Sequence, residues 1–189
     1  MERITRNQVR TNLIVGETEN TEKTNNLTKQ RWGFLCGLLL CIIGLNACDS
    51  SRIFEQNVDI VQSKWYKDSV LKFTFEITDT LSRYKFYYNI RNTVSYPFYN
   101  MYVTYYLVDS LDRRIASDLQ NIDLMHPKTG KPYGDGLGDI FSHQLLALSN
   151  VKFLKRGKYT FKIKHYMRRD PLPEVVSMGL RIEKVPPLK

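Results

Sequence analysis

Apolar and polar residues alternate with a period of two along most of the chain after residue 70, and this pattern constrains the fold more than any other feature. Successive side chains of a β-strand point to opposite faces of its sheet, so each alternating run predicts a strand with one buried and one exposed face. The apolar positions are also rich in aromatic and β-branched residues, which favour strands. The alternating runs are residues 70–77, 84–91, 99–107, 159–167 and 177–185.

After residue 48, no segment keeps a helical period of 3.6 residues over three turns. Residues 144–153 are the one segment that fits a short helix as well as a strand. Strands separated by short polar turns are typical of sandwiches and related all-β folds. We therefore predict an all-β fold, an antiparallel β-sandwich or jelly-roll-like single domain, over residues 59–189.

The N-terminal segment predicts export. Residues 1–31 are polar, and we expect them to be unstructured. The apolar run that follows, residues 32–45, is shorter than the about 20 residues of a membrane-spanning helix but fits the core of a signal peptide behind a basic flank. It ends in Leu45, Asn46, Ala47 and Cys48, which is similar to the lipobox of bacterial lipoproteins, where cleavage precedes a cysteine whose thiol is acylated.

These features predict a leader and signal over 1–47, a covalent lipid on Cys48 and a tether over 48–58. A plain transmembrane anchor, or a cleaved signal with a coincidental cysteine, is the alternative. Cleavage would remove Cys36 and Cys41, leaving Cys48 as the one cysteine of the mature chain. Because its thiol is acylated, we expect no disulfide, no cysteine nucleophile and no cysteine metal site.

The chain carries a formal net charge of +9, from 28 basic and 19 acidic residues. Residues 1–47 hold six of the basic and four of the acidic residues, so the mature part keeps 22 and 15, or +7. Since the domain is predicted to be exported, we expect no nucleic-acid partner. The positive charge of the domain would favour binding to acidic envelope polymers, lipid headgroups or an acidic protein patch.

Residues 126–139 are rich in glycine and proline and predict a long loop. A phosphate-binding loop would need Lys and Ser or Thr after its last glycine, where this chain has Asp139-Ile140. A calcium site built from Asp135 and Asp139 lacks identifiable further oxygen ligands. We therefore predict no metal site in this loop.

No catalytic motif stands out. The three histidines, His126, His143 and His165, lack the spacing of metal ligands. Ser142 and His143 are neighbours in a predicted strand, so their side chains point to opposite faces and do not pair. Nothing nominates a pair of carboxylates for hydrolysis. The sequence predicts no enzyme, and an envelope hydrolase remains only as the least favoured alternative.

Tyrosines and basic residues occupy the expected polar faces of several strands and suggest a contact surface for a protein or a glycan. The simpler alternative is that they form cross-strand pairs on a solvated face, or lie under a second sheet. A basic stripe in 162–169 includes Tyr166. The candidate contact residues are Tyr87, Arg91, Tyr102, Tyr106, Lys162, Lys164, Arg168 and Arg169.

Several short segments occur in a fixed order along residues 48–185. They are Phe75–Thr80, Tyr88–Arg91, Tyr96–Asn100, Gly134–Ile140, Gly157–Phe161, Met167–Leu172 and Met178–Glu183, preceded by Trp65 and by the lipobox cysteine. Together they resemble the gliding motility lipoprotein GldH family of Bacteroidetes. The resemblance implies a lipid-anchored envelope protein of a gliding or secretion-linked machine, without catalytic residues or a cofactor beyond the lipid on Cys48. It does not distinguish the inner from the outer membrane.

The leading hypothesis is therefore a non-enzymatic, lipid-anchored module that binds protein partners of the gliding or secretion apparatus. The alternative is an envelope glycan-binding β-sandwich, in which exposed tyrosines stack on sugar rings.

Overall fold

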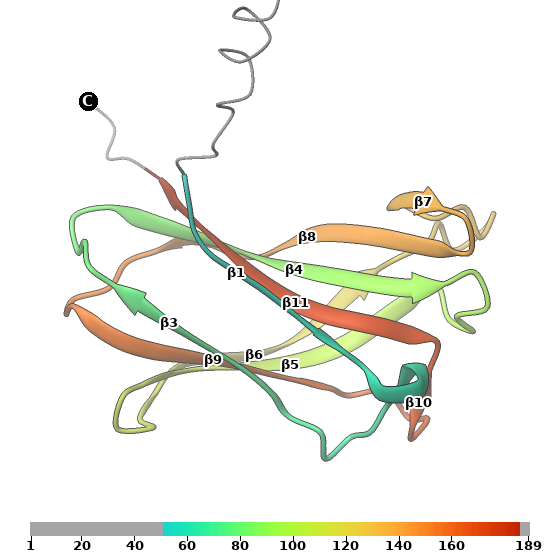
Figure 1. Cartoon of the computed structure of the whole chain (residues 1–189), viewed down its shortest axis with the longest axis horizontal. Helices are drawn as coiled ribbons and strands as arrows, with labels where there is room; N and C mark the ends of the chain where they lie inside the picture. The colour runs from blue at the N-terminus through green and yellow to red at the C-terminus, as the bar shows by residue number, and fades with distance from the viewer. Residues whose placement is uncertain (1–50, 186–189) are drawn as a thin grey trace, which may run out of the picture. The chain divides into compact units, whose positions relative to one another are not determined.

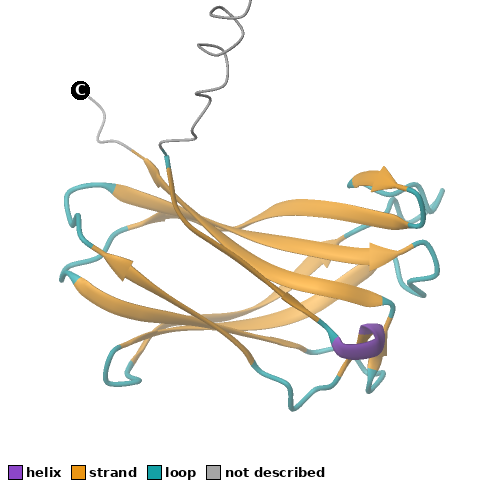
Figure 2. Cartoon of the chain, in the orientation of Figure 1, coloured by secondary structure: helices purple, strands orange, loops and turns teal. Residues whose placement is uncertain are grey.

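The computed structural model describes residues 51–185 (Figure 1). The predicted leader, the lipobox residues Leu45, Asn46 and Ala47, and Cys48 lie outside the described residues. Within 51–185 the chain is built from strands and one short 3₁₀ turn, η1 (Val61–Ser63), as Figure 2 shows. No helix in this range is long and apolar enough to span a membrane.

Two antiparallel sheets face one another. The first sheet has five strands, in the order β1 (Arg52–Asp59), β11 (Val175–Val185), β4 (Arg83–Thr93), β8 (Ile140–Val151) and β7 (Asp135–Leu137). The second sheet has four, in the order β3 (Leu71–Ile77), β9 (Gly157–His165), β5 (Asn100–Asp109) and β6 (Arg114–Asp123). A small two-stranded pair joins β10 (Leu172–Pro173) to β2 (Lys64–Trp65). The all-β sandwich prediction is confirmed.

The core lies between the two sheets and follows the alternation of the sequence. Tyr84, Phe86, Tyr88 and Ile90 of β4 are buried, while the residues between them are more exposed. Strands β3, β5 and β9 show the same pattern. The ring of Phe161 on β9 illustrates the packing, since it stacks on Tyr105 with 5.2 Å between centroids and an interplanar angle of 7°.

The N-terminal boundary of the domain differs from the prediction. Residues 52–58, which the sequence predicts as part of a tether, form β1 and pair with β11 from Arg52 opposite Glu183 to Asp59 opposite Ser177. The reason is that β1 is an edge strand with few inward apolar residues, so its sequence resembles a polar linker. The predicted domain start at 59 therefore moves to about residue 52.

Two further segments differ from expectation. Residues 144–153, where a helix competes in the sequence, lie mainly in β8, which pairs with β4 through two irregularities in register. Such bulges disturb the period of two and weaken the strand signal. The predicted loop 126–139 contains strand β7, which pairs with the start of β8.

Candidate interaction surface

The outer face of the second sheet brings together most of the predicted contact residues. Tyr106 on β5 lies opposite Lys162 on β9, and Thr104 lies opposite Lys164. One step further along, the Tyr166 N–H donates to the carbonyl oxygen of Tyr102 at 2.7 Å. Their side chains share this face because inward neighbours such as Val103 and Ile163 are buried in the core.

A hollow of about 500 Å³ opens at the end of this face, where β5 begins and β9 ends. Its exposed walls are Tyr166, Leu119 and Tyr102, whose exposed fractions are 58%, 48% and 39%. The Tyr102 N–H donates to the Met167 sulfur at 3.2 Å, which fixes one wall against the sheet. The hollow is lined by Phe98, Tyr102, Leu119, Tyr166, Met167 and Arg168.

Basic side chains surround these aromatic residues. The Arg114 guanidinium lies over the Tyr106 ring, 5.4 Å from its centroid, in cation–π geometry. Lys162 is paired, with 2.5 Å between its Nζ and Oδ1 of Asp112. Lys164, Arg168 and Arg169 form no ion pair within residues 51–185, and both arginines are exposed. This surface therefore combines apolar contact area with cations available to a ligand.

Two predicted contact residues lie elsewhere. Tyr87 and Arg91 belong to β4 and point from the outer face of the first sheet, so the structure does not bring them to the hollow. Burial, together with the charge and hydrogen bonding of Glu183, raises the pKa of Tyr87. The eight predicted residues therefore do not form one surface, because Tyr87 and Arg91 lie on the first sheet and the others lie on the second sheet or in the loop after β9.

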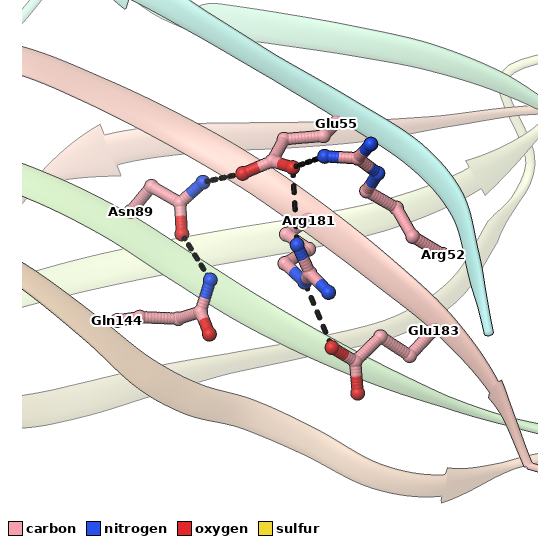
Figure 3. Close-up of polar contacts among 6 residues, drawn as sticks. All are labelled: Arg52, Glu55, Asn89, Gln144, Arg181 and Glu183. Atoms are coloured by element: carbon pink, nitrogen blue, oxygen red, sulfur yellow. Dashed lines mark hydrogen bonds and ion pairs between the residues drawn. The ribbon is translucent and has the colours of Figure 1, made fainter. Parts of the chain in front are cut away.

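The outer face of the first sheet is occupied by a polar network (Figure 3). Glu55 accepts hydrogen bonds from Arg52 at 2.7 Å, Asn89 at 2.9 Å and Arg181 at 3.1 Å. Arg181 also pairs with Glu183 at 2.8 Å. Since these side chains satisfy one another, this face resembles a structural network more than a binding site.

The histidines have structural positions. His143 is buried, and its Nε2 lies 2.9 Å from Asn92 Oδ1. His165 is buried with its ring 5.3 Å from that of Trp65. His126 Nδ1 accepts the N–H groups of Lys128 and Thr129 in the glycine-rich segment. Among residues 51–185 no group of three or more His, Cys, Asp or Glu is arranged to hold a metal ion.

Phe98, Leu119 and Met167 line the hollow, although no pattern in the sequence marks them as contact residues. Leu119 lies in β6, a largely exposed edge strand without clear alternation of apolar and polar residues. Phe98 lies in the turn before β5. Tyr102 and Arg168, which are predicted contact residues, and Tyr166 within the basic stripe are the sequence signals that point to the hollow.

The fold and this surface define a β-sandwich domain with an aromatic and basic outer face. A profile of the GldH lipoproteins matches residues 52–182. The chain therefore belongs to the GldH lipoprotein family.

Two relatives are similar over most of their length. The gliding motility lipoprotein GldH homolog of Christiangramia forsetii is 30% identical over 156 residues, covering 77% of this chain and 92% of the relative. The gliding motility lipoprotein GldH of Flavobacterium johnsoniae is 30% identical over 158 residues, covering 78% of this chain and 94% of the relative.

Solved structures are only distantly similar. A β-porphyranase from Bacteroides plebeius aligns with a TM-score of 0.35 and 19% identity, over 75% of this chain and 22% of the enzyme chain. An arabinose-bound α-L-arabinofuranosidase aligns with a TM-score of 0.33 and 10% identity, over 69% of this chain and 19% of the other. TM-scores this low support no inference about activity.

Proposed function

We propose that this protein is a non-enzymatic, lipid-anchored module of the cell envelope that binds a protein partner of a gliding or secretion-linked machine. Membership of the GldH lipoprotein family and the names of both relatives support a location in the cell envelope and a link to gliding. The lipobox supports a lipid on Cys48 as the anchor.

The single observation that supports a binding role is the hollow on the second sheet. Tyr102, Leu119 and Tyr166 expose apolar surface around it, and Arg168 lines it. Exposed aromatic residues and arginine are the residue types enriched at the energetic centres of protein interfaces. The partner is expected to insert an apolar side chain into the hollow and to present acidic residues to Arg168 and Lys164.

A second hollow, of about 450 Å³, lies between β6 and β8 and has a more polar lining. Two of its lining side chains form hydrogen bonds within the domain. Asp118 Oδ1 accepts the Leu119 N–H at 2.8 Å, and Gln120 Nε2 donates to the Ala147 carbonyl at 3.0 Å. These contacts favour a structural role for the two side chains.

Site-specific photocrosslinking in the native envelope tests the binding role. A photoreactive phenylalanine analogue is placed at Tyr166, and at Tyr133 as a control with a similar exposed fraction, 56%. Tyr133 lies in the loop beside His126, apart from the hollow. We expect an adduct from position 166 that mass spectrometry identifies as an envelope protein, and none from position 133. Equal adducts from both positions, or none from either, would refute the proposal.

A glycan ligand is the alternative, favoured by the exposure of the Tyr102 and Tyr166 rings beside an open hollow. Aromatic rings at such a site would stack on sugar rings. A glycan array separates the two functions. Specific binding that disappears in Tyr166→Ala would favour the glycan-binding function, and an array without hits would exclude it.

A further inference from the structure

One end of the sandwich gathers the start of β1 and three loops. The register places Arg52 of β1 opposite Glu183, Tyr84 of β4 opposite Val151, and Ile77 of β3 opposite Gly157. Asp109, at the end of β5, lies opposite Tyr159 near the start of β9. The loops 78–82, 110–113 and 152–156 therefore share this end with the first described residues of the chain, at the left in Figure 1.

The loop 152–156 presents a leucine to solvent from a fixed backbone. Phe153 is buried, with its ring 4.5 Å from that of Tyr159. The Tyr159 hydroxyl donates to the Lys155 carbonyl at 2.7 Å. Between these two attachments Leu154 is 87% exposed. Because both neighbours are held, the exposure of Leu154 is a feature of the folded loop.

Each of the other two loops also presents an exposed leucine beside an aspartate. Asp79 Oδ1 accepts the Leu81 N–H at 2.8 Å, and Leu81 is 82% exposed. Asp109 Oδ1 accepts the Leu111 N–H at 2.9 Å, and Leu111 is 71% exposed. A single exposed leucine needs no explanation, but three on adjoining loops at one end of the domain form an apolar rim.

The charge at this end is positive. Lys152, Lys155 and Arg156 flank Leu154, are exposed, and form no ion pair within the described range. Two aspartates at this end are already paired, Asp79 with Lys184 at 2.6 Å and Asp109 with Arg113 at 2.7 Å. Exposed apolar residues between unpaired cations are the combination that binds an anionic lipid surface.

We propose that this end of the domain lies on the membrane surface and inserts Leu154 and Leu81 among anionic headgroups. This inference rests on the proposed lipid at Cys48. Because β1 begins at Arg52, the chain from Cys48 spans at most roughly 14 Å. So short a link holds the loops beside the lipid. The hollow lies toward the opposite end of the second sheet, so this orientation directs it away from the membrane, toward partners.

Fluorescence depth measurement on the lipidated mature protein in vesicles tests the orientation. The Leu154→Cys variant is labelled with an environment-sensitive fluorophore and reconstituted in phosphatidylcholine vesicles containing phosphatidylglycerol. The Val61→Cys variant is the matched control, because Val61 is 81% exposed and lies in η1, at the other end of β1. We expect a blue-shifted emission at position 154 that nitroxide-labelled lipids quench, and a solvent-like, unquenched emission at position 61.

Equal quenching at the two positions would overturn the proposal. A blue shift at 154 without quenching by nitroxide lipids would also overturn it, since a second copy of the chain would then cover the loop. Reversing the charges (Lys152→Glu, Lys155→Glu, Arg156→Glu) is expected to lower the quenching at 154, and unchanged quenching would contradict the role of the cations. Labelling of the parent protein, without an added cysteine, would instead show that Cys48 carries a free thiol and that the anchor itself fails.

Discussion

Glu55 on β1 accepts a hydrogen bond from Arg181 on β11, with 3.1 Å between Oε2 and Nη1. This contact joins β1, the strand nearest the proposed anchor, to its neighbour β11 in the first sheet. Burial raises the pKa of Glu55, but the hydrogen bonds from Arg52 and Asn89 and the charge of Arg181 outweigh it and lower the pKa below the usual value. The carboxylate therefore stabilises β1 in its charged form.

The first prediction is that Glu55→Gln lowers the free energy of unfolding by about 1 kcal/mol near neutral pH, the upper range for partly exposed ion pairs. The loss should shrink as the pH falls, because the stabilisation from a lowered pKa is complete above the pKa of the unfolded carboxyl and disappears as the pH falls through the folded pKa. Urea denaturation at neutral and acidic pH measures both effects. A loss that does not change with pH would contradict the role of the charge.

The second prediction concerns the contact that closes the sandwich between β4 and β6. The Tyr88 hydroxyl donates to Gln120 Oε1 at 2.8 Å, and burial raises the pKa of Tyr88. Gln120→Ala leaves this buried hydroxyl without its partner, so we expect a loss of about 1–3 kcal/mol in unfolding free energy. In the Tyr88→Phe background the same substitution should cost less. Equal costs in both backgrounds would show that the two residues are not coupled.

The third prediction is a loss of stability in mild acid. Burial lowers the pKa of both His143 and His165 from the ordinary value of 6.5, because it disfavours the charged imidazolium in the folded protein. Below about pH 6.5 the unfolded chain takes up protons that the folded chain does not, and unfolding becomes easier as the pH falls. The limiting slope is about 1.4 kcal/mol per pH unit for each histidine.

Urea midpoints between neutral pH and about pH 5 measure this slope, across the range where an ordinary histidine titrates. The His143→Gln, His165→Gln double variant should show a shallower dependence on pH than the parent. If the parent stability is constant over this range, the account of the buried histidines is wrong.

The fourth prediction tests the packing that holds the loop 152–156. The Phe153 ring lies 4.5 Å from that of Tyr159 and 5.5 Å from that of Tyr84. We expect Phe153→Ala to cost about 3–5 kcal/mol, as for other buried aromatic residues, and Phe153→Leu to cost clearly less. After removal of residues 1–47, Trp65 is the one tryptophan, so its fluorescence reports unfolding. Equal costs for the two variants would mean that the ring fills no tight site.

Much of the fold follows from the sequence because inward and outward residues alternate cleanly in strands with one buried face. In β9, Tyr159, Phe161, Ile163 and His165 are buried, as the period of two predicts. The alternation fails where a strand buries little, as in β6, or where register irregularities shift its faces, as in β8. Its absence therefore marks edge strands and bulges as much as loops.

The candidate surface was harder to predict, because it depends on which strands are neighbours. Alternation places Tyr102 and Tyr87 each on an outer face, but only the order of strands shows that these faces belong to different sheets. Leu119 joins the hollow because β6 pairs with β5, which brings it opposite Thr104. The sequence of β6 contains no pattern that specifies this pairing.

The most direct test of the central claim is the mass of the N-terminal peptide of the mature protein, isolated from the membrane fraction. A lipid-anchored protein predicts a peptide that begins at Cys48 and carries a covalent acyl modification on that residue. A peptide that begins elsewhere, or an unmodified Cys48, would contradict the anchor and with it the proposed orientation of the domain at the membrane.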